Sequence, residues 1–74
     1  MMNPQPSPDQ LRAELALLDE DEAAAAIEVS EKTLRNYRRL GIGPRFAVVR
    51  RKPKYTMPWL KQWLEAGGAR AIYD

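Results

Sequence analysis

The sequence predicts one small domain, mainly α-helical with a single short β-hairpin. Apolar side chains recur at the three- and four-residue spacing of helices in several short segments, and a capping residue precedes three of them. Residues 46–56 do not follow this helical period, and they instead have the pattern of two short strands joined by a turn. At 74 residues the chain has room for one core, which typically supplies only roughly 3–5 kcal/mol of stability.

The residue types that are absent limit the possible chemistry. The chain has no cysteine and no histidine, which removes disulfides, thiolate zinc sites, imidazole bases and most metal sites. No apolar run reaches the ~18–20 residues of a membrane span, and Met1–Pro8 lacks the basic and apolar regions of a signal peptide. We therefore expect a cytoplasmic protein that is not an enzyme, uses no cofactor or metal and has no membrane partner.

The charges are distributed unevenly along the chain. The net charge is only +2, but residues 1–29 carry seven of the ten acidic residues and a single basic one. Residues 32–54 carry nine basic residues and no acidic one. This polarity favours a polyanionic partner for one face of the domain.

A short extra helix is predicted at the N-terminus, over residues 8–18. Residues 1–7 are polar and proline-containing, and we expect them to be a disordered lead-in. Ser7 is placed to cap the helix, and Pro8 suits its first position. The apolar stripe of this helix consists of Leu11, Leu15 and Leu18.

A second helix is predicted over Glu20–Ile27. Asp19 is placed as its cap and Glu22 closes a capping box, while the acids of the first turn favour the positive end of the helix. Four consecutive carboxylates could also suggest a metal site. We favour the helix start, because adjacent side chains on a helix point in different directions.

The third predicted helix runs from Glu31 to Leu40, with Ser30 as its cap and Gly41 as its stop. At 100° per residue, one arc of the helix is apolar and the remainder is mostly basic. The core-facing arc is expected to hold Thr33, Leu34, Tyr37 and Leu40. The exposed remainder is expected to hold Glu31, Lys32, Arg35, Asn36, Arg38 and Arg39.

The remaining elements are a hairpin and a last helix. Residues 46–49 and 54–56 are expected to pair as strands, joined by a basic turn over residues 50–53. The last helix opens at Pro58, and a pair of glycines ends it before a tail at residues 67–74. Its core-facing side chains are expected to be Trp59, Leu60, Trp63 and Leu64.

Helix, turn, helix, hairpin and helix in this order predict a winged helix-turn-helix domain over residues 19–66. The Glu31–Leu40 helix would then enter the major groove, where arginine pairs with guanine and asparagine with adenine. On this helix Lys32, Arg35, Asn36 and Arg39 share the exposed face, while Tyr37 and Arg38 lie nearer its rim. The basic wing is expected on the flanking phosphate backbone or in the minor groove. The candidate DNA-binding residues are Ser30, Lys32, Thr33, Arg35, Asn36, Tyr37, Arg38, Arg39, Arg50, Arg51, Lys52 and Lys54.

Two segments resemble known DNA-binding proteins. The run VSEKTLRNYRRLGI at residues 29–42 is similar to the helix-turn-helix pattern V-S-x-x-T-L-R-Y-Y-x-x-x-G-L of the MerR superfamily. Residues 43–55 and the helix that follows look like the wing and last helix of its small AlpA- and excisionase-like members. The resemblance covers about two thirds of the chain. It implies that the Ser30–Leu40 helix contacts bases and phosphates through Arg35 and its neighbours, flanked by the Arg50–Lys54 wing.

The chain departs from this family at identifiable positions. Glu28 stands where the family has a turn glycine, so a positive φ there would cost about 1 kcal/mol. Asn36 replaces the first of the paired tyrosines, and the wing tip has no glycine. The dimerisation helix and effector domain of full-length MerR regulators have no counterpart here, so no small-molecule effector is expected.

The function expected from these observations is sequence-preferring binding to double-stranded DNA. A small transcriptional regulator or an excisionase (recombination directionality factor) of a mobile element fits best, bacterial or phage-encoded and associated with the nucleoid. Its further partners would be an integrase or more copies of itself on tandem sites. The alternatives are the DNA-recognition domain of a phage terminase small subunit, or a protein–protein interaction module that uses the acidic half, Asp9–Glu28.

Overall fold

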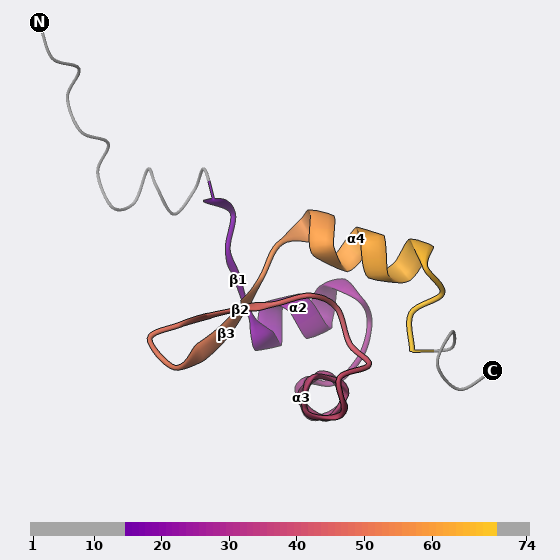
Figure 1. The fold of residues 1–74 in the computed structure, drawn as a ribbon, viewed down its shortest axis with the longest axis horizontal. Coiled ribbons are helices and arrows are strands. Elements are labelled where there is room, and N and C mark those ends of the chain that lie inside the picture. The colour runs from indigo at the N-terminus through magenta and orange to yellow at the C-terminus, as the bar shows by residue number, and fades with distance from the viewer. Residues whose placement is uncertain (1–14, 70–74) are drawn as a thin grey trace, which may run out of the picture.

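Three helices and a three-stranded antiparallel sheet make up the described part of the chain. The computed structural model describes residues 15–69. In Figure 1 the β2–β3 hairpin extends away from the helices, and α3 is seen end-on. The elements, in chain order, are β1 (Leu18–Asp19), α2 (Glu20–Ala26), α3 (Glu31–Leu40), β2 (Ala47–Val49), β3 (Lys52–Tyr55) and α4 (Met57–Glu65).

The sheet contains a strand that the sequence pattern did not predict. β3 is its central strand, with β1 on one side and β2 on the other. Leu18 lies opposite Tyr55 in the β1–β3 pair. The prediction of a helix through residue 18 is therefore wrong at its end, because pairing requires an extended backbone and Ala16 already has a left-handed φ of 50°. Residues 1–14, with the rest of that predicted helix, lie outside the described residues.

The hairpin is confirmed, but its turn is tighter than predicted. Only Arg50 and Arg51 connect β2 to β3, with φ values of 52° and 67°. Positive φ at both residues is what a two-residue hairpin turn needs to match the twist of its strands. β3 consequently starts at Lys52, where a turn residue was expected, and Val48 lies opposite Pro53. Pro53 occupies the part of β3 that β1 does not reach.

The core lies where α2, α3, β3 and α4 meet. Its fully buried side chains are Ala23, Ala24, Leu34, Tyr55 and Leu60, with Leu18, Ile27, Val29 and Tyr37 packed against them. Two leucines predicted to be in the core are not there: Leu40 is 65% exposed and Leu64 is 52% exposed. The small residues of α2 let that helix pack closely against α3.

The turn between α2 and α3 follows the predicted course. α2 ends at Ala26, and the backbone N–H of Val29 donates to the Ala24 carbonyl at 3.0 Å. Glu28 has a φ of 62°, so the strained conformation expected from its missing glycine is present. The predicted start of α3 at a Ser30 cap is confirmed by the Thr33 N–H, which donates to the Ser30 hydroxyl at 3.0 Å.

Close contacts hold α4 to the end of α3. Gly41 ends α3 with a φ of 72°, as predicted. A Cβ at Gly43 would lie 3.0 Å from the Tyr37 Cβ, so only glycine lets the chain pass this close to α3. The Trp63 ring of α4 packs against the Tyr37 ring in a tilted arrangement, with ring centres 5.8 Å apart, and the indole N–H donates to the Ile42 carbonyl at 2.9 Å. α4 starts one residue earlier than predicted, after a Thr56 cap.

A membrane-spanning segment is not found among the helices of residues 15–69, because none of them is long and apolar enough.

Candidate nucleic-acid interface

Helix α3 divides into a packed face and an exposed face, but the division differs from the prediction in one respect. In angular order the packed face runs through Thr33, Tyr37, Leu34 and Arg38. Leu40, expected in the core, lies just beyond Thr33 and is exposed. The packed arc is thus rotated toward Arg38, and the reason is an acidic partner on α2.

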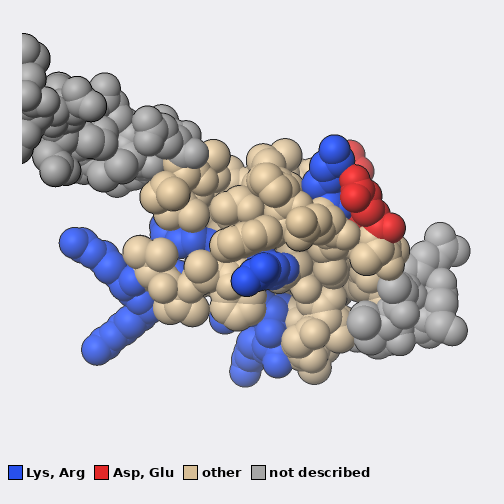
Figure 2. Space-filling model, turned by 45° about the horizontal axis from the view of Figure 1, so that its top comes forward, with Lys and Arg blue, Asp and Glu red and all other residues tan. Residues whose placement is uncertain are grey.

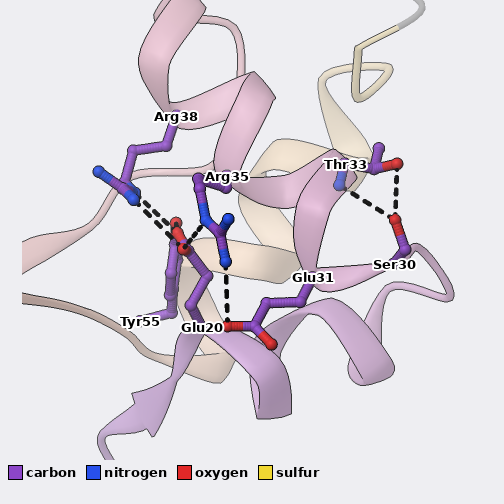
Figure 3. Close-up of polar contacts among 7 residues, drawn as sticks. All are labelled: Glu20, Ser30, Glu31, Thr33, Arg35, Arg38 and Tyr55. Carbon is purple, nitrogen blue, oxygen red and sulfur yellow. Dashed lines mark hydrogen bonds and ion pairs between the residues drawn. The ribbon is translucent and has the colours of Figure 1, made fainter.

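That partner is Glu20, a carboxylate that is only 8% exposed. Arg38 donates to it twice, from Nε to Oε2 at 2.7 Å and from Nη2 to Oε1 at 3.2 Å. The Tyr55 hydroxyl donates to Oε2 at 2.9 Å, and Arg35 Nε lies 3.9 Å from Oε1. Figure 3 shows Glu20 at the centre of these three side chains. A single carboxylate therefore connects α2, α3 and β3.

The Glu20 network changes the acidity of its members. Burial by itself would raise the pKa of the Glu20 carboxyl, but the hydrogen bonds from Arg38 and Tyr55 and the charges of both arginines outweigh it. The pKa of Glu20 consequently lies below its ordinary value of 4.5. Burial and the neighbouring Glu20 carboxylate raise the pKa of Tyr55 above its ordinary value of 10.0. The network is thus held in its charged-carboxylate, neutral-phenol form.

The pKa of Glu20 predicts that the domain loses stability in acid. A carboxyl whose pKa is lowered by folding contributes stability that is present above pH 4.5 and lost as the pH falls through the folded pKa. We expect the melting temperature, measured by circular dichroism between pH 7 and pH 3, to decrease once the pH is below 4.5. Glu20→Gln should show a smaller fall than the wild type, because it lacks the carboxyl whose protonation is linked to unfolding. An equal fall in both proteins would contradict this assignment.

The exposed face of α3 carries the four side chains predicted for it. Lys32, Asn36 and Arg39 are exposed, and no acidic side chain within residues 15–69 forms an ion pair with Lys32 or Arg39. Arg35 is half-exposed, and its guanidinium lies between Glu20 and Glu31, with Nη2 3.5 Å from a Glu31 oxygen. This face presents three cations and one amide to solvent.

The hairpin carries a second group of cations. Arg50, Arg51 and Lys52 are exposed and form no ion pair with the acids of the described chain. Lys54 differs, because its ammonium forms an ion pair with Asp19 and its side chain is only 22% exposed. Figure 2 shows Lys and Arg side chains projecting at the end of the molecule where the hairpin turn lies, with acidic groups only at the opposite end of this view.

The other predicted site residues have structural contacts. Ser30 caps α3, and its hydroxyl donates to the Thr33 hydroxyl at 2.8 Å, so both side chains are engaged at the start of the helix. Tyr37 packs against Trp63 and Gly43, consistent with the expectation that it faces the core. Arg38 was expected at the rim of the interface and is instead bound by Glu20.

Two residues at or behind the candidate interface were not predicted from the sequence. Glu20 shares a helix stripe with Ala23, Ala24 and Ile27, at the spacing i, i+3, i+4 and i+7, and that spacing could have marked it as buried. Arg45 belongs to the basic segment but was not singled out. It is exposed, and its guanidinium lies 5.6 Å from the centre of the Trp59 ring.

The acidic start of α2 behaves as a helix cap. Glu22 accepts a hydrogen bond from the Asp19 N–H at 2.9 Å, which confirms the predicted capping box. Contrary to the expectation that adjacent carboxylates diverge, Asp19, Asp21 and Glu22 each place one oxygen within 4.8 Å of the others. All three are exposed, and the Glu22 carboxylate is engaged in the capping contact.

The chain matches no protein-family model and no curated protein sequence.

Proposed function

We propose that this protein is a winged helix-turn-helix protein that binds double-stranded DNA. One observation carries the proposal: exposed cations without ion-pair partners among the described residues occur on α3, on the segment that follows it and on the hairpin that would form the wing. They are Lys32, Arg39, Arg45, Arg50, Arg51 and Lys52. Cations that are free of internal acids are available to neutralise phosphates and release counterions.

The order and geometry of the elements support the same proposal. α2, a short turn and α3 follow one another as in a helix-turn-helix, and α3 has an exposed polar face that is ten residues long. A helix of this size fits the major groove, where Arg35 could pair with guanine and Asn36 with adenine. The turn residues Arg50 and Arg51 project from the hairpin, where the sugar–phosphate backbone would be their target.

Within this class we propose a small transcriptional regulator or an excisionase of a mobile element. The similarity of residues 29–42 to the MerR-superfamily pattern supports this choice. A single domain of this size buries too little surface for tight specific binding, so an integrase or further copies on tandem sites would supply the remaining affinity.

The salt dependence of DNA binding tests the proposed function. If about four to six of these cations meet phosphates, log K should fall against log salt with a slope of about −4 to −5. The measurement is fluorescence anisotropy on a mixed-sequence duplex between 50 and 300 mM salt. A slope shallower than about −2 would instead favour a protein–protein interaction module.

A matched pair of variants locates the surface. Arg50→Gln/Arg51→Gln should reduce the magnitude of the slope by about two units, because two phosphate contacts are lost. The control is Lys61→Gln on α4, whose side chain is 78% exposed and ion-paired with Glu65 at 3.9 Å. It should leave the slope unchanged, and equal effects of hairpin and α4 substitutions would reject the proposed surface.

A further inference from the structure

Arg38 and Arg39 are neighbours on α3 with different surroundings. Arg38 makes two hydrogen bonds to Glu20, at 2.7 and 3.2 Å, and its side chain is 26% exposed. Arg39 is exposed and forms no ion pair within the part of the chain that the structure describes. The chain therefore offers two arginines on one helix, one committed to an internal carboxylate and one available to a ligand.

The Glu20 carboxylate cannot easily release Arg38. Its side chain is 9% exposed, and Tyr55 donates a further hydrogen bond at 2.9 Å. Moving the Arg38 guanidinium to a DNA phosphate would leave a buried carboxylate without its main counter-charge, which is strongly unfavourable. Arg38 should therefore stay with Glu20 when α3 meets DNA.

Glu20 also limits where Arg35 can go. The Arg35 guanidinium has Nε 3.9 Å from a Glu20 oxygen and Nη2 3.5 Å from a Glu31 oxygen. Figure 3 shows the guanidinium between the two carboxylates. A side chain that is already oriented loses less rotamer freedom when it contacts a ligand. The two carboxylates thus favour one orientation of the Arg35 guanidinium, which limits its contacts with nearby phosphates.

We propose that Glu20 is a specificity-determining residue of the DNA interface, which keeps Arg38 away from the phosphate backbone and orients Arg35 toward the bases. The inference rests on the proposed DNA-binding function. Phosphate contacts strengthen binding to every sequence alike, whereas base contacts discriminate between sequences. Glu20 would keep Arg38 out of the phosphate contacts and orient Arg35 for a base contact. It would thereby raise the ratio of specific to non-specific DNA affinity.

The first test compares Arg38→Gln with Arg39→Gln on a mixed-sequence duplex at several salt concentrations. Glutamine at position 38 can still donate to Glu20, and circular dichroism establishes that both variants are folded. Arg39→Gln should reduce the magnitude of the salt slope by about one unit, and Arg38→Gln should leave it at the wild-type value. If Arg38→Gln reduces the slope as much as Arg39→Gln, the inference is overturned.

The second test removes the carboxylate. Glu20→Gln and Asp21→Asn each delete one negative charge from α2, but Asp21 is exposed and forms no ion pair within residues 15–69. Binding is measured on a random duplex and on a site that the wild type selects from a random library. Glu20→Gln should steepen the slope by about one unit and lower the ratio of selected to random affinity several-fold. Asp21→Asn should leave that ratio unchanged, and identical ratios for the two variants would overturn the inference.

The two proposals fail in different ways. A wild-type protein without salt-dependent duplex binding would reject the proposed function itself. A wild type with a steep slope, but with equal effects of Arg38→Gln and Arg39→Gln, would reject only the role of Glu20. If Glu20→Gln does not fold, the comparison of Arg38→Gln with Arg39→Gln is sufficient to test the role of Glu20.

Discussion

Tyr55→Ala should abolish cooperative folding of the domain at 25 °C. The Tyr55 side chain is fully buried, its ring lies 6.1 Å from that of Phe46, and its hydroxyl donates to Glu20. Truncating a buried aromatic side chain costs about 3–5 kcal/mol, which is comparable with the whole stability of so small a domain. The expected result is loss of the helical circular dichroism signal and of a cooperative thermal transition.

Tyr55→Phe is the control for this variant. It keeps the ring and removes only the hydrogen bond to Glu20, at an expected cost of about 1–3 kcal/mol. It should therefore fold, with a melting temperature lowered by roughly 4–8 °C for each kcal/mol lost. A Tyr55→Ala protein that melts cooperatively within a few degrees of the wild type would show that Tyr55 does not hold β3 to the core.

Trp63→Ala should be the next most damaging substitution. The indole packs on Tyr37 at 5.8 Å, donates to the Ile42 carbonyl at 2.9 Å and lies against Gly68. Because Trp63 is half-buried, we expect a loss near the lower end of the range for tryptophan truncation, about 3 kcal/mol. Urea denaturation followed by circular dichroism would measure this loss.

Trp63→Phe separates packing from hydrogen bonding at the same position. It keeps an aromatic ring beside Tyr37 and loses the bond to the Ile42 carbonyl, so about 1 kcal/mol is expected. A Trp63→Ala protein with wild-type stability would mean that α4 is not held to the end of α3 by this side chain.

The sequence was a reliable guide to the start of α2 and to both ends of α3. The Ser30 cap, the Gly41 stop and the Glu22 capping box were all predicted, because each depends on side chains within four residues of one another. The φ of Glu28 is positive, and its indication in the sequence is the turn glycine that the resembled family has at this position. Local hydrogen bonding and backbone sterics decide these features, and both can be inferred from short segments.

The exposed face of the candidate interface was predicted equally well. Lys32, Asn36 and Arg39 are exposed because charged and amide side chains stay in water unless a partner compensates for their burial. The cations of the hairpin tip followed from composition, since the nine basic residues between 32 and 54 have no acidic neighbour in that stretch. The turn there was misplaced, because arginine gives no local sign that it will adopt a positive φ.

Tertiary structure decided what depends on distant partners. Leu18 became part of β1 because Tyr55, far along the chain, offers it a strand to pair with. Arg38 is packed at one edge of the buried face of α3, and Leu40 at the other edge is exposed, because Glu20, 18 residues from Arg38, supplies a buried carboxylate for its guanidinium. Hydropathy ranks leucine above arginine for burial, but a charge that is paired and hydrogen-bonded can be buried while an apolar residue remains in solvent. Patterns along the sequence determine where helices form, whereas such pairings between elements determine which face of each helix is buried.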